Sequence, residues 1–252
     1  LNKKFKVNGK CRKWALLSLE PRFGDTLKSF KENFERSCQN VGISLGQCFL
    51  DTVLKREKLE DLCKHLAENQ VDFALFVEQR AKNDSSHNMI KLYERKYGFQ
   101  TQCIAFQNAF GFTKNPNDRK YRGIFEKILL KTNEKLGGRN YDLKPDDLAK
   151  SVLRPGVMVM GVDVSHPAPL KKKDRDAGRE QFEPSVIGAT ANKAMDVYAF
   201  TGEYHYQSGR NEHITSMEDL TVEFCRRYMD GKKYPIKIVI FRNGVADNQF
   251  EM

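Results

Sequence analysis

In the first half of the chain, segments with the hydrophobic pattern of a buried strand alternate with segments that have the pattern of a helix. Three runs are mostly apolar, as in buried strands, at residues 13–19, 71–77 and 101–106. Elsewhere apolar residues recur at the spacing of a helix face, in segments that begin near Leu27, Leu59, Met89 and Tyr121. The last of these helices is predicted to end at Gly137 and Gly138. Strands that alternate with helices predict an α/β layered domain with a parallel sheet.

The second half has a different order of elements. Buried-strand runs at residues 157–164, 185–192 and 197–206 predict a meander, and an amphipathic helix follows between Ile214 and Tyr228. A last strand is predicted at residues 236–241. Strands, then a helix, then a strand is the order of a ribonuclease-H-like core, although order alone leaves other folds open. We interpret residues 140–154 as a linker and the charged stretch at residues 171–173 as part of a loop.

Charge narrows the class of partner. The formal net charge of +10 and the pI of about 9.2 suit a polyanion such as nucleic acid, although a soluble protein that is merely basic has the same surplus. The six cysteines form no Cys-x-x-Cys pair and have no zinc-site spacing with histidine. We therefore expect reduced thiols in a cytoplasmic or nuclear protein.

Membrane and secretory features are not expected. No apolar run approaches the roughly 20 residues of a membrane span, and no signal peptide is recognisable, so we predict no membrane partner. The chain begins with Leu1 rather than Met and stops just after a predicted strand, so we expect a piece of a longer protein.

Two basic clusters are candidates for anion binding. Lys127, Lys131 and Lys135 lie four residues apart, so on a helix they form one stripe away from the apolar face. His87 and Lys91 are also four apart, at the start of a predicted helix whose N-terminus favours anions. Each cluster by itself also fits an ordinary solvated surface.

The order of these residues resembles the guide-anchoring pocket in the MID domain of eukaryotic Argonautes. The matching positions are His87, Lys91, Gln102, Cys103, Lys131 and Lys135, the last followed by Leu-Gly-Gly. The resemblance implies that these residues form a site for the 5′ phosphate of a guide RNA. Lysines supply charge there, and Gln102 supplies an amide donor.

One position departs from the usual family pattern. The family has an aromatic residue, a tyrosine, where this chain has His87, and the resemblance places that side chain on the first base of the guide. A histidine in this pattern resembles the worm-specific Argonautes that carry secondary small RNAs with 5′ triphosphates. Residues 79–86 correspond to the family's loop that reads the first base.

Two further motifs resemble the PIWI domain of the same family. Residues 161–167, GVDVSHP, are similar to its opening strand, and residues 241–245, FRNGV, are similar to a later strand end. Asp247, Gln249 and Phe250 continue the second match. Together with the basic clusters, the resemblance covers about residues 13–252.

Cutting members of this family require acidic residues. Ribonuclease-H-type cleavage uses two Mg²⁺ ions, which prefer anionic oxygen ligands. The resemblance places Asp163, Glu212 and Asn243 at the first three catalytic positions. Asn243 has a neutral amide where the family has an aspartate, so we expect a weak or absent Mg²⁺ site at Asp163 and no cutting. Taken alone, Asp163 would also fit a carboxylate in a turn after a strand, and Glu212 would fit an acid near the start of a helix. Asn243 would likewise fit an ordinary turn-forming residue.

These patterns and the resemblance predict an α/β protein with two parts. A Rossmann-like MID domain is expected at residues 1–139, and the N-terminal part of a ribonuclease-H-like PIWI domain at residues 140–252. The predicted function is small-RNA-guided silencing through binding of the guide's 5′ phosphate, without slicing. The expected partners are a small guide RNA, a complementary target RNA and silencing effector proteins. Mg²⁺ is the cofactor that the resemblance allows, at the 5′-phosphate site or the PIWI site.

Three other functions are considered. The first is an active Mg²⁺-dependent slicer that tolerates Asn243. The second is a nuclease of the ribonuclease-H class that uses no guide. The third, a Rossmann-like cofactor enzyme, is disfavoured because no Gly-x-Gly-x-x-Gly segment follows a predicted strand.

Overall fold

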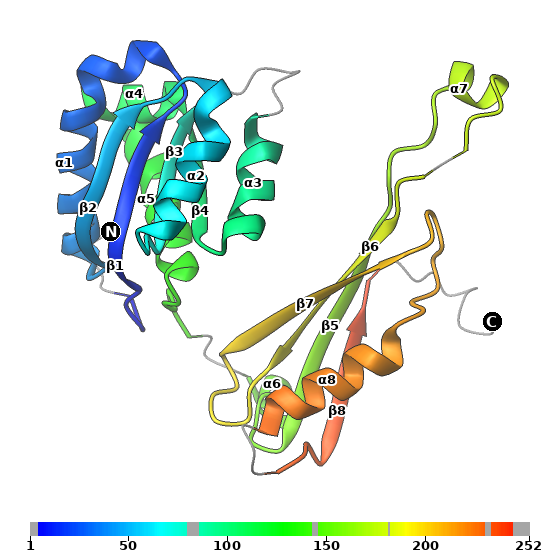
Figure 1. Ribbon diagram of the computed structural model, residues 1–252. Coiled ribbons are helices and arrows are strands. Elements are labelled where there is room, and N and C mark those ends of the chain that lie inside the picture. Colours follow the sequence, from blue (N-terminus) through cyan, green and yellow to red (C-terminus); the bar gives the residue numbers. More distant parts are fainter. Residues whose placement is uncertain (1–4, 80–85, 143–145, 181, 230–232, 244–252) are drawn as a thin grey trace. The chain divides into compact units, whose positions relative to one another are not determined.

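The chain divides into two compact units, Leu1–Asp142 and Leu143–Met252 (Figure 1). The computed structural model describes residues 5–79, 86–142, 146–180, 182–229 and 233–243. The first unit contains β1 (Lys10–Ser18), α1 (Gly24–Val41), β2 (Ser44–Val53), α2 (Leu59–Glu68), β3 (Phe73–Glu78), α3 (Ser86–Tyr97), β4 (Gln100–Ala105), α4 (Phe106–Lys114) and α5 (Arg119–Lys135). No helix in the described ranges is long and apolar enough to cross a membrane.

The first unit is built on a parallel sheet with the strand order β2-β1-β3-β4. All six residues of the inner strand β3 are buried, so both faces of the sheet must be covered. Helices α1, α4 and α5 pack on one face, and α2 and α3 pack on the other (Figure 1). The predicted parallel α/β layered domain is confirmed.

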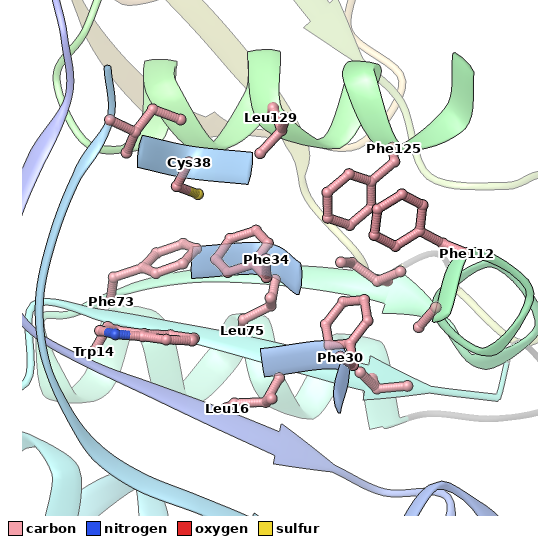
Figure 2. Packing of buried hydrophobic residues seen from close by; sticks show 14 of the residues in the cluster. Trp14, Leu16, Phe30, Phe34, Cys38, Phe73, Leu75, Phe112, Phe125 and Leu129 are labelled. Carbon is pink, nitrogen blue, oxygen red and sulfur yellow. The ribbon is translucent and has the colours of Figure 1, made fainter. Parts of the chain in front are cut away.

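Aromatic side chains fill the core on the α1 face of this sheet (Figure 2). Trp14 of β1 is fully buried, and its ring centroid lies 5.5 Å from that of Phe34 on α1. Phe30 of α1 and Phe125 of α5 meet edge to face. Each such buried side chain stabilises the fold by about 1.5–3 kcal/mol, so this packing holds α5 firmly on the sheet.

Asn133 ties the C-terminal part of α5 to the start of the chain. Its side chain is completely buried, and its Oδ1 accepts a hydrogen bond from the backbone N–H of Gly9 at 2.7 Å. Its Nδ2 donates to the carbonyl oxygen of Val7 at 3.1 Å and to Oδ1 of Asn140 at 3.0 Å. The position of the last turn of α5 is therefore fixed from both sides.

The second unit combines a meander with one crossover. It contains α6 (Asp147–Val152), β5 (Val157–Ser165), α7 (Lys172–Asp176), β6 (Ser185–Asn192), β7 (Phe200–Gln207), α8 (Met217–Met229) and β8 (Lys237–Arg242). The strand order is β7-β6-β5-β8; β5, β6 and β7 pair antiparallel, and β8 pairs parallel to β5. Leu220, Phe224 and Tyr228 of α8 pack on Met158 and Met160 of β5. The predicted strands, helix and strand are confirmed.

Several elements differ from the prediction. Strand β2 and helix α4 were not predicted, because β2 is a half-exposed edge strand without a continuous apolar run and α4 follows β4 without a break. The linker interpretation of residues 140–154 is wrong at α6, and the loop interpretation of residues 171–173 is wrong at α7, where Lys172 begins a short helix. Residues 80–85 of the predicted base-reading loop, and Asp247, Gln249 and Phe250, lie outside the described ranges.

Candidate functional site

The predicted phosphate site lies around β4, which pairs with β3 on one side. Side chains alternate along a strand, so Thr101 and Cys103 share one face and Gln102 lies on the other. Thr101 and Cys103 face α3, and Gln102 faces α5. The two helices that carry the predicted lysines therefore lie on opposite faces of the same strand.

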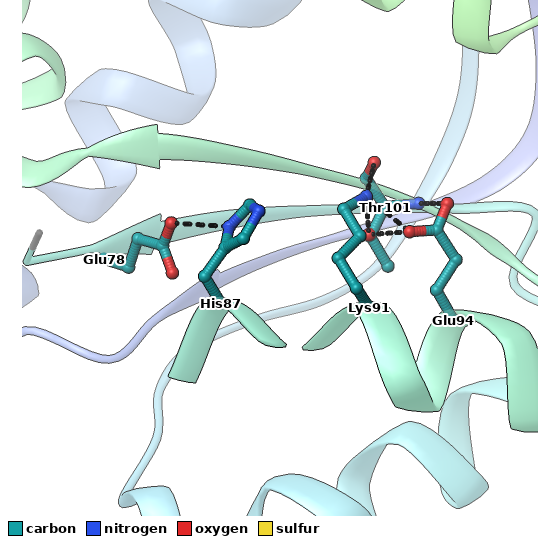
Figure 3. Close-up of polar contacts among 5 residues, drawn as sticks. All are labelled: Glu78, His87, Lys91, Glu94 and Thr101. Atoms are coloured by element: carbon teal, nitrogen blue, oxygen red, sulfur yellow. Dashed lines mark hydrogen bonds and ion pairs between the residues drawn. The ribbon is translucent and has the colours of Figure 1, made fainter. Parts of the chain in front are cut away.

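Lys91 is held by a small polar network on the α3 face (Figure 3). Its ammonium group contacts the Glu94 carboxylate and donates to Oγ1 of Thr101 at 2.9 Å and to the carbonyl oxygen of Thr101 at 3.3 Å. Thr101 also donates its hydroxyl and its backbone N–H to Glu94, at 2.5 Å and 3.2 Å. Burial by itself raises the pKa of Glu94, but the hydrogen bonds from Lys91 and Thr101 outweigh it and hold that pKa below its ordinary value. Lys91 is thus fixed in position by these contacts.

Lys135 reaches the same place from the end of α5. Burial lowers the pKa of its ammonium group, and the nearby positive charge of Lys91 lowers it further, while Glu94 opposes this shift. Two lysines that are distant in sequence are therefore close enough to repel each other. The Glu94 carboxylate offsets only part of this repulsion, and a phosphate would make the pair of lysines favourable.

Gln102 and Lys131 complete the predicted set with different surroundings. The Gln102 amide is buried; its Nε2 donates to the carbonyl oxygen of Ile128 at 3.1 Å, and its Oε1 accepts from the Thr132 hydroxyl at 3.0 Å. Lys131 is exposed one turn before Lys135. Lys91 and Lys135 are therefore brought together, Lys131 lies on the adjacent turn, and the Gln102 amide is directed toward α5.

His87 has a partner that the sequence pattern did not indicate. Its Nδ1 lies 3.1 Å from Oε1 of Glu78, the last residue of β3 (Figure 3). The Glu78 side chain is only 3% exposed, whereas that of His87 is 48% exposed, so the imidazole keeps one side open to solvent. Cys103 lies nearby, where burial and the charge of Glu78 raise its pKa to about 12.

In the second unit, Asp163 and Asn243 line one cavity of about 610 Å³. Gly161 pairs with Phe241 and Val162 with Arg242 in the parallel register of β5 and β8, and the backbone N–H of Asn243 donates to the carbonyl oxygen of Val162 at 3.1 Å. Asn243 therefore follows β8 at the level of Asp163. Two of the three predicted catalytic positions share this site.

Glu212 lies in a different environment. Its Oε1 is 3.1 Å from Nε2 of His166, although the pair lacks hydrogen-bond geometry, and its carbonyl oxygen accepts a hydrogen bond from Arg242 at 2.6 Å. The His166 ring is held from its other side, since Nδ1 lies 2.8 Å from Oγ of Ser185. Glu212 is not among the residues that line the cavity of Asp163.

The donor set at this cavity fits a two-Mg²⁺ centre poorly. Asp163 is a carboxylate, but Asn243 is a neutral amide. Glu203 also lines the cavity, but it pairs across the sheet with Ala189, on the face that α8 covers, and its carboxylate contacts Arg227 of α8. Among the described residues that line this cavity, Asp163 is therefore the one carboxylate on the face opposite α8, whereas two Mg²⁺ ions require several anionic oxygens.

Sequence reasoning missed Glu78, Glu94 and Thr101. Glu94 follows Lys91 by three residues, a spacing that places two side chains on one helix face, so it could have been found. Glu78 ends the buried run of β3, and an acid at that point was a usable signal. Only the pairing of β3 with β4 places Thr101 beside α3.

Comparison with known proteins identifies the family. The model of the Piwi domain matches residues 72–252, which is more than half of the chain. The chain belongs to the Piwi domain family.

Among curated relatives of this Piwi-family chain, "Protein argonaute-2" of Drosophila melanogaster is 27% identical over 250 residues, covering 96% of this chain and 19% of that protein. "Putative protein tag-76" of Caenorhabditis elegans is 24% identical over 252 residues, covering 95% of this chain and 23% of that protein. The chain thus spans about a fifth of the length of these relatives.

Solved structures share the fold. The MID-PIWI domains of N. crassa QDE-2 AGO superpose with a TM-score of 0.72 at 21% identity, covering 99% of this chain and 67% of that one. Kluyveromyces polysporus Argonaute with a guide RNA gives a TM-score of 0.73 at 20% identity, and the match covers 97% of this chain and 29% of that one. The predicted Argonaute resemblance and fold class are confirmed. The worm-specific subfamily, the division at residue 139 and the roles of the site residues stay predictions.

Proposed function

We propose that this chain takes part in small-RNA-guided silencing and that its first unit, as a MID domain, holds the 5′ phosphate of a guide RNA. Lys91, Lys131 and Lys135 supply the positive charge, and His87 stacks on the first base. Gln102 takes part either by turning its amide from Ile128 to the phosphate or by holding α5 in place. The second unit is then the first part of a PIWI domain.

The closeness of Lys91 and Lys135 carries this proposal. The positive charge of Lys91 lowers the pKa of Lys135, so the folded chain holds two like charges together at a free-energy cost. Packing of α5 and the network of Glu94 and Thr101 maintain this arrangement. A phosphate with two negative charges relieves the repulsion and gains charge-assisted hydrogen bonds.

Binding of short single-stranded RNA tests the proposal directly. Two RNAs of one sequence, with a 5′ phosphate or a 5′ hydroxyl, are titrated into the chain. We expect the phosphorylated RNA to bind more tightly, and Lys91→Ala or Lys131→Ala to weaken its binding by about 1.5–3 kcal/mol, or roughly ten- to a hundredfold. Lys127→Ala is the matched control, because Lys127 is exposed on the same helix two turns before Lys135. Equal affinity for both RNAs would reject the phosphate site.

We propose further that silencing proceeds without cutting. The neutral Asn243 beside Asp163 and the placement of Glu212 against His166 support this proposal. The alternative is an Mg²⁺-dependent slicer. The full-length protein, loaded with a guide and given a matched target and Mg²⁺, is expected to leave the target intact. Cutting at a single phosphodiester that Asp163→Ala abolishes would establish the alternative.

The class of guide follows from the same pocket. The presence of His87 with this lysine and glutamine pattern supports secondary small RNAs with 5′ triphosphates as the guides. The further partners are complementary target RNA and silencing effector proteins. The protein acts in the cytoplasm or the nucleus. Sequencing of RNA that co-purifies with the protein, with and without removal of 5′ polyphosphates, tests this class. RNAs recovered equally in both libraries would carry monophosphates and contradict it.

A further inference from the structure

Three donor groups of different kinds meet on the α3 face of the first unit. Glu78 ends β3, His87 lies in the first turn of α3, and Cys103 lies on β4. One oxygen, one ring nitrogen and one sulfur of these side chains all lie within 4.8 Å of one another. Within this group, Oε1 of Glu78 and Nδ1 of His87 lie 3.1 Å apart.

The strand pairing explains why these residues meet. Cys103 pairs with Phe76, and Glu78 follows Phe76 by two residues, so Glu78 and Cys103 point to the same face of the sheet. Helix α3 packs on that face and brings His87 to them. Glu78 is almost completely buried, and a carboxylate in that position is costly unless a cation or several donors compensate its charge.

We propose that Glu78, His87 and Cys103 form a zinc site. Thiolate, imidazole and carboxylate are the three ligand types that Zn²⁺ takes in proteins, whereas a thiolate disfavours Mg²⁺ and Ca²⁺. With the usual bond lengths of about 2.0–2.3 Å, ligand atoms of a tetrahedral zinc lie roughly 3.4–3.6 Å apart. The observed spacing needs only small side-chain movements to reach that geometry. The half-exposed His87 leaves the fourth position to water or another small ligand.

This site goes beyond the proposed guide binding, because it requires no RNA. It shares His87 and Cys103 with the predicted phosphate site, so zinc would fix the imidazole that is expected to meet the first base. Binding replaces the thiol proton of Cys103 by the metal, and the buried charge of Glu78 is then compensated.

Zinc and cobalt titrations of the 252-residue chain test the site. Calorimetry with Zn²⁺ is expected to give one site, and Co²⁺ in its place is expected to give the thiolate-to-cobalt absorption of a tetrahedral site. Glu78→Gln and Cys103→Ser are each expected to weaken binding by more than about 100-fold, since loss of an outer partner alone costs about 10–100-fold. Cys225→Ser, which removes a partly buried cysteine of the second unit, is the matched control and is expected to bind as the unmodified chain does.

Each outcome separates this inference from guide binding. Thermal unfolding establishes that the variants are folded before they are titrated. Absence of the thiolate absorption in the unmodified chain, or its persistence in Cys103→Ser, would overturn the zinc site. Neither result depends on RNA. Conversely, equal binding of phosphorylated and unphosphorylated RNA by a chain that holds zinc would reject only the guide-binding proposal.

Discussion

Lys135 is a residue whose charge is unfavourable in the free protein. Burial and the neighbouring Lys91 both lower its pKa, so folding brings its ammonium group into a less favourable environment than water. Glu94 compensates in part, because its carboxylate contacts Lys91 and its negative charge raises the pKa of Lys135. A residue retained at such a cost is typical of a binding site rather than of a stabilising surface.

Replacement of this lysine is expected to change stability and binding in opposite directions. Lys135→Gln removes the like-charge repulsion and should stabilise the free chain by roughly 0.5 kcal/mol, while it weakens binding of 5′-phosphorylated RNA. Because the pKa of Lys135 is lower in the folded chain than in the unfolded chain, its protonated form destabilises the fold. This destabilisation disappears as pH rises from the lowered pKa of the folded chain to the ordinary pKa of the unfolded chain. The stability difference in chemical denaturation should therefore shrink at alkaline pH. Lys127→Gln should alter neither property, and a destabilised Lys135→Gln would contradict this account.

At the scale of elements, α3, β4 and α5 make the candidate site. The periodic apolar face of α5 and the apolar run of β4 predicted both elements, and the motif order predicted their lysines and glutamine. Of the partners that were not predicted, Glu78 and Glu94 had a signal in the sequence, whereas Thr101 is brought to Lys91 only by strand pairing. The same reason hides the cluster of Glu78, His87 and Cys103, since their spacing along the chain resembles no zinc motif.

Asn133 is expected to control the position of α5. Asn133→Leu keeps a similar side-chain volume but leaves the Gly9 N–H and the Val7 carbonyl without this partner. Each buried polar group that loses its partner costs about 1–3 kcal/mol, so we expect the free energy of unfolding to fall by at least about 2 kcal/mol in urea. Asn40→Leu, at an exposed position of α1, is the control and should stay within about 0.5 kcal/mol of the unmodified chain. Equal effects of the two substitutions would show that Asn133 does not anchor α5.

At the scale of the whole molecule, the net charge of +10 acts on any RNA that approaches the chain. Binding of single-stranded RNA releases condensed counterions, so affinity should fall with salt. The fall measures how many phosphates the protein neutralises, which separates lysines that contact RNA from lysines that only add to the net charge.

The salt dependence of RNA binding therefore distinguishes Lys131 from Lys127. The logarithm of the affinity should fall linearly with the logarithm of the salt concentration, with a slope of about −0.7 for each phosphate neutralised. Lys131→Gln is expected to reduce the slope by about 0.7, and Lys127→Gln is expected to leave it unchanged. Identical slopes for the two variants would mean that the stripe of lysines acts only as a diffuse charge.

The buried position of Trp14 has a practical consequence. It is the only tryptophan in the sequence, and it lies in the aromatic core of the first unit, while the second unit has none. Intrinsic tryptophan fluorescence thus reports on one half of the chain, whereas circular dichroism sums over both. A melting experiment followed by the two signals together can resolve whether the halves unfold as one cooperative body or in succession.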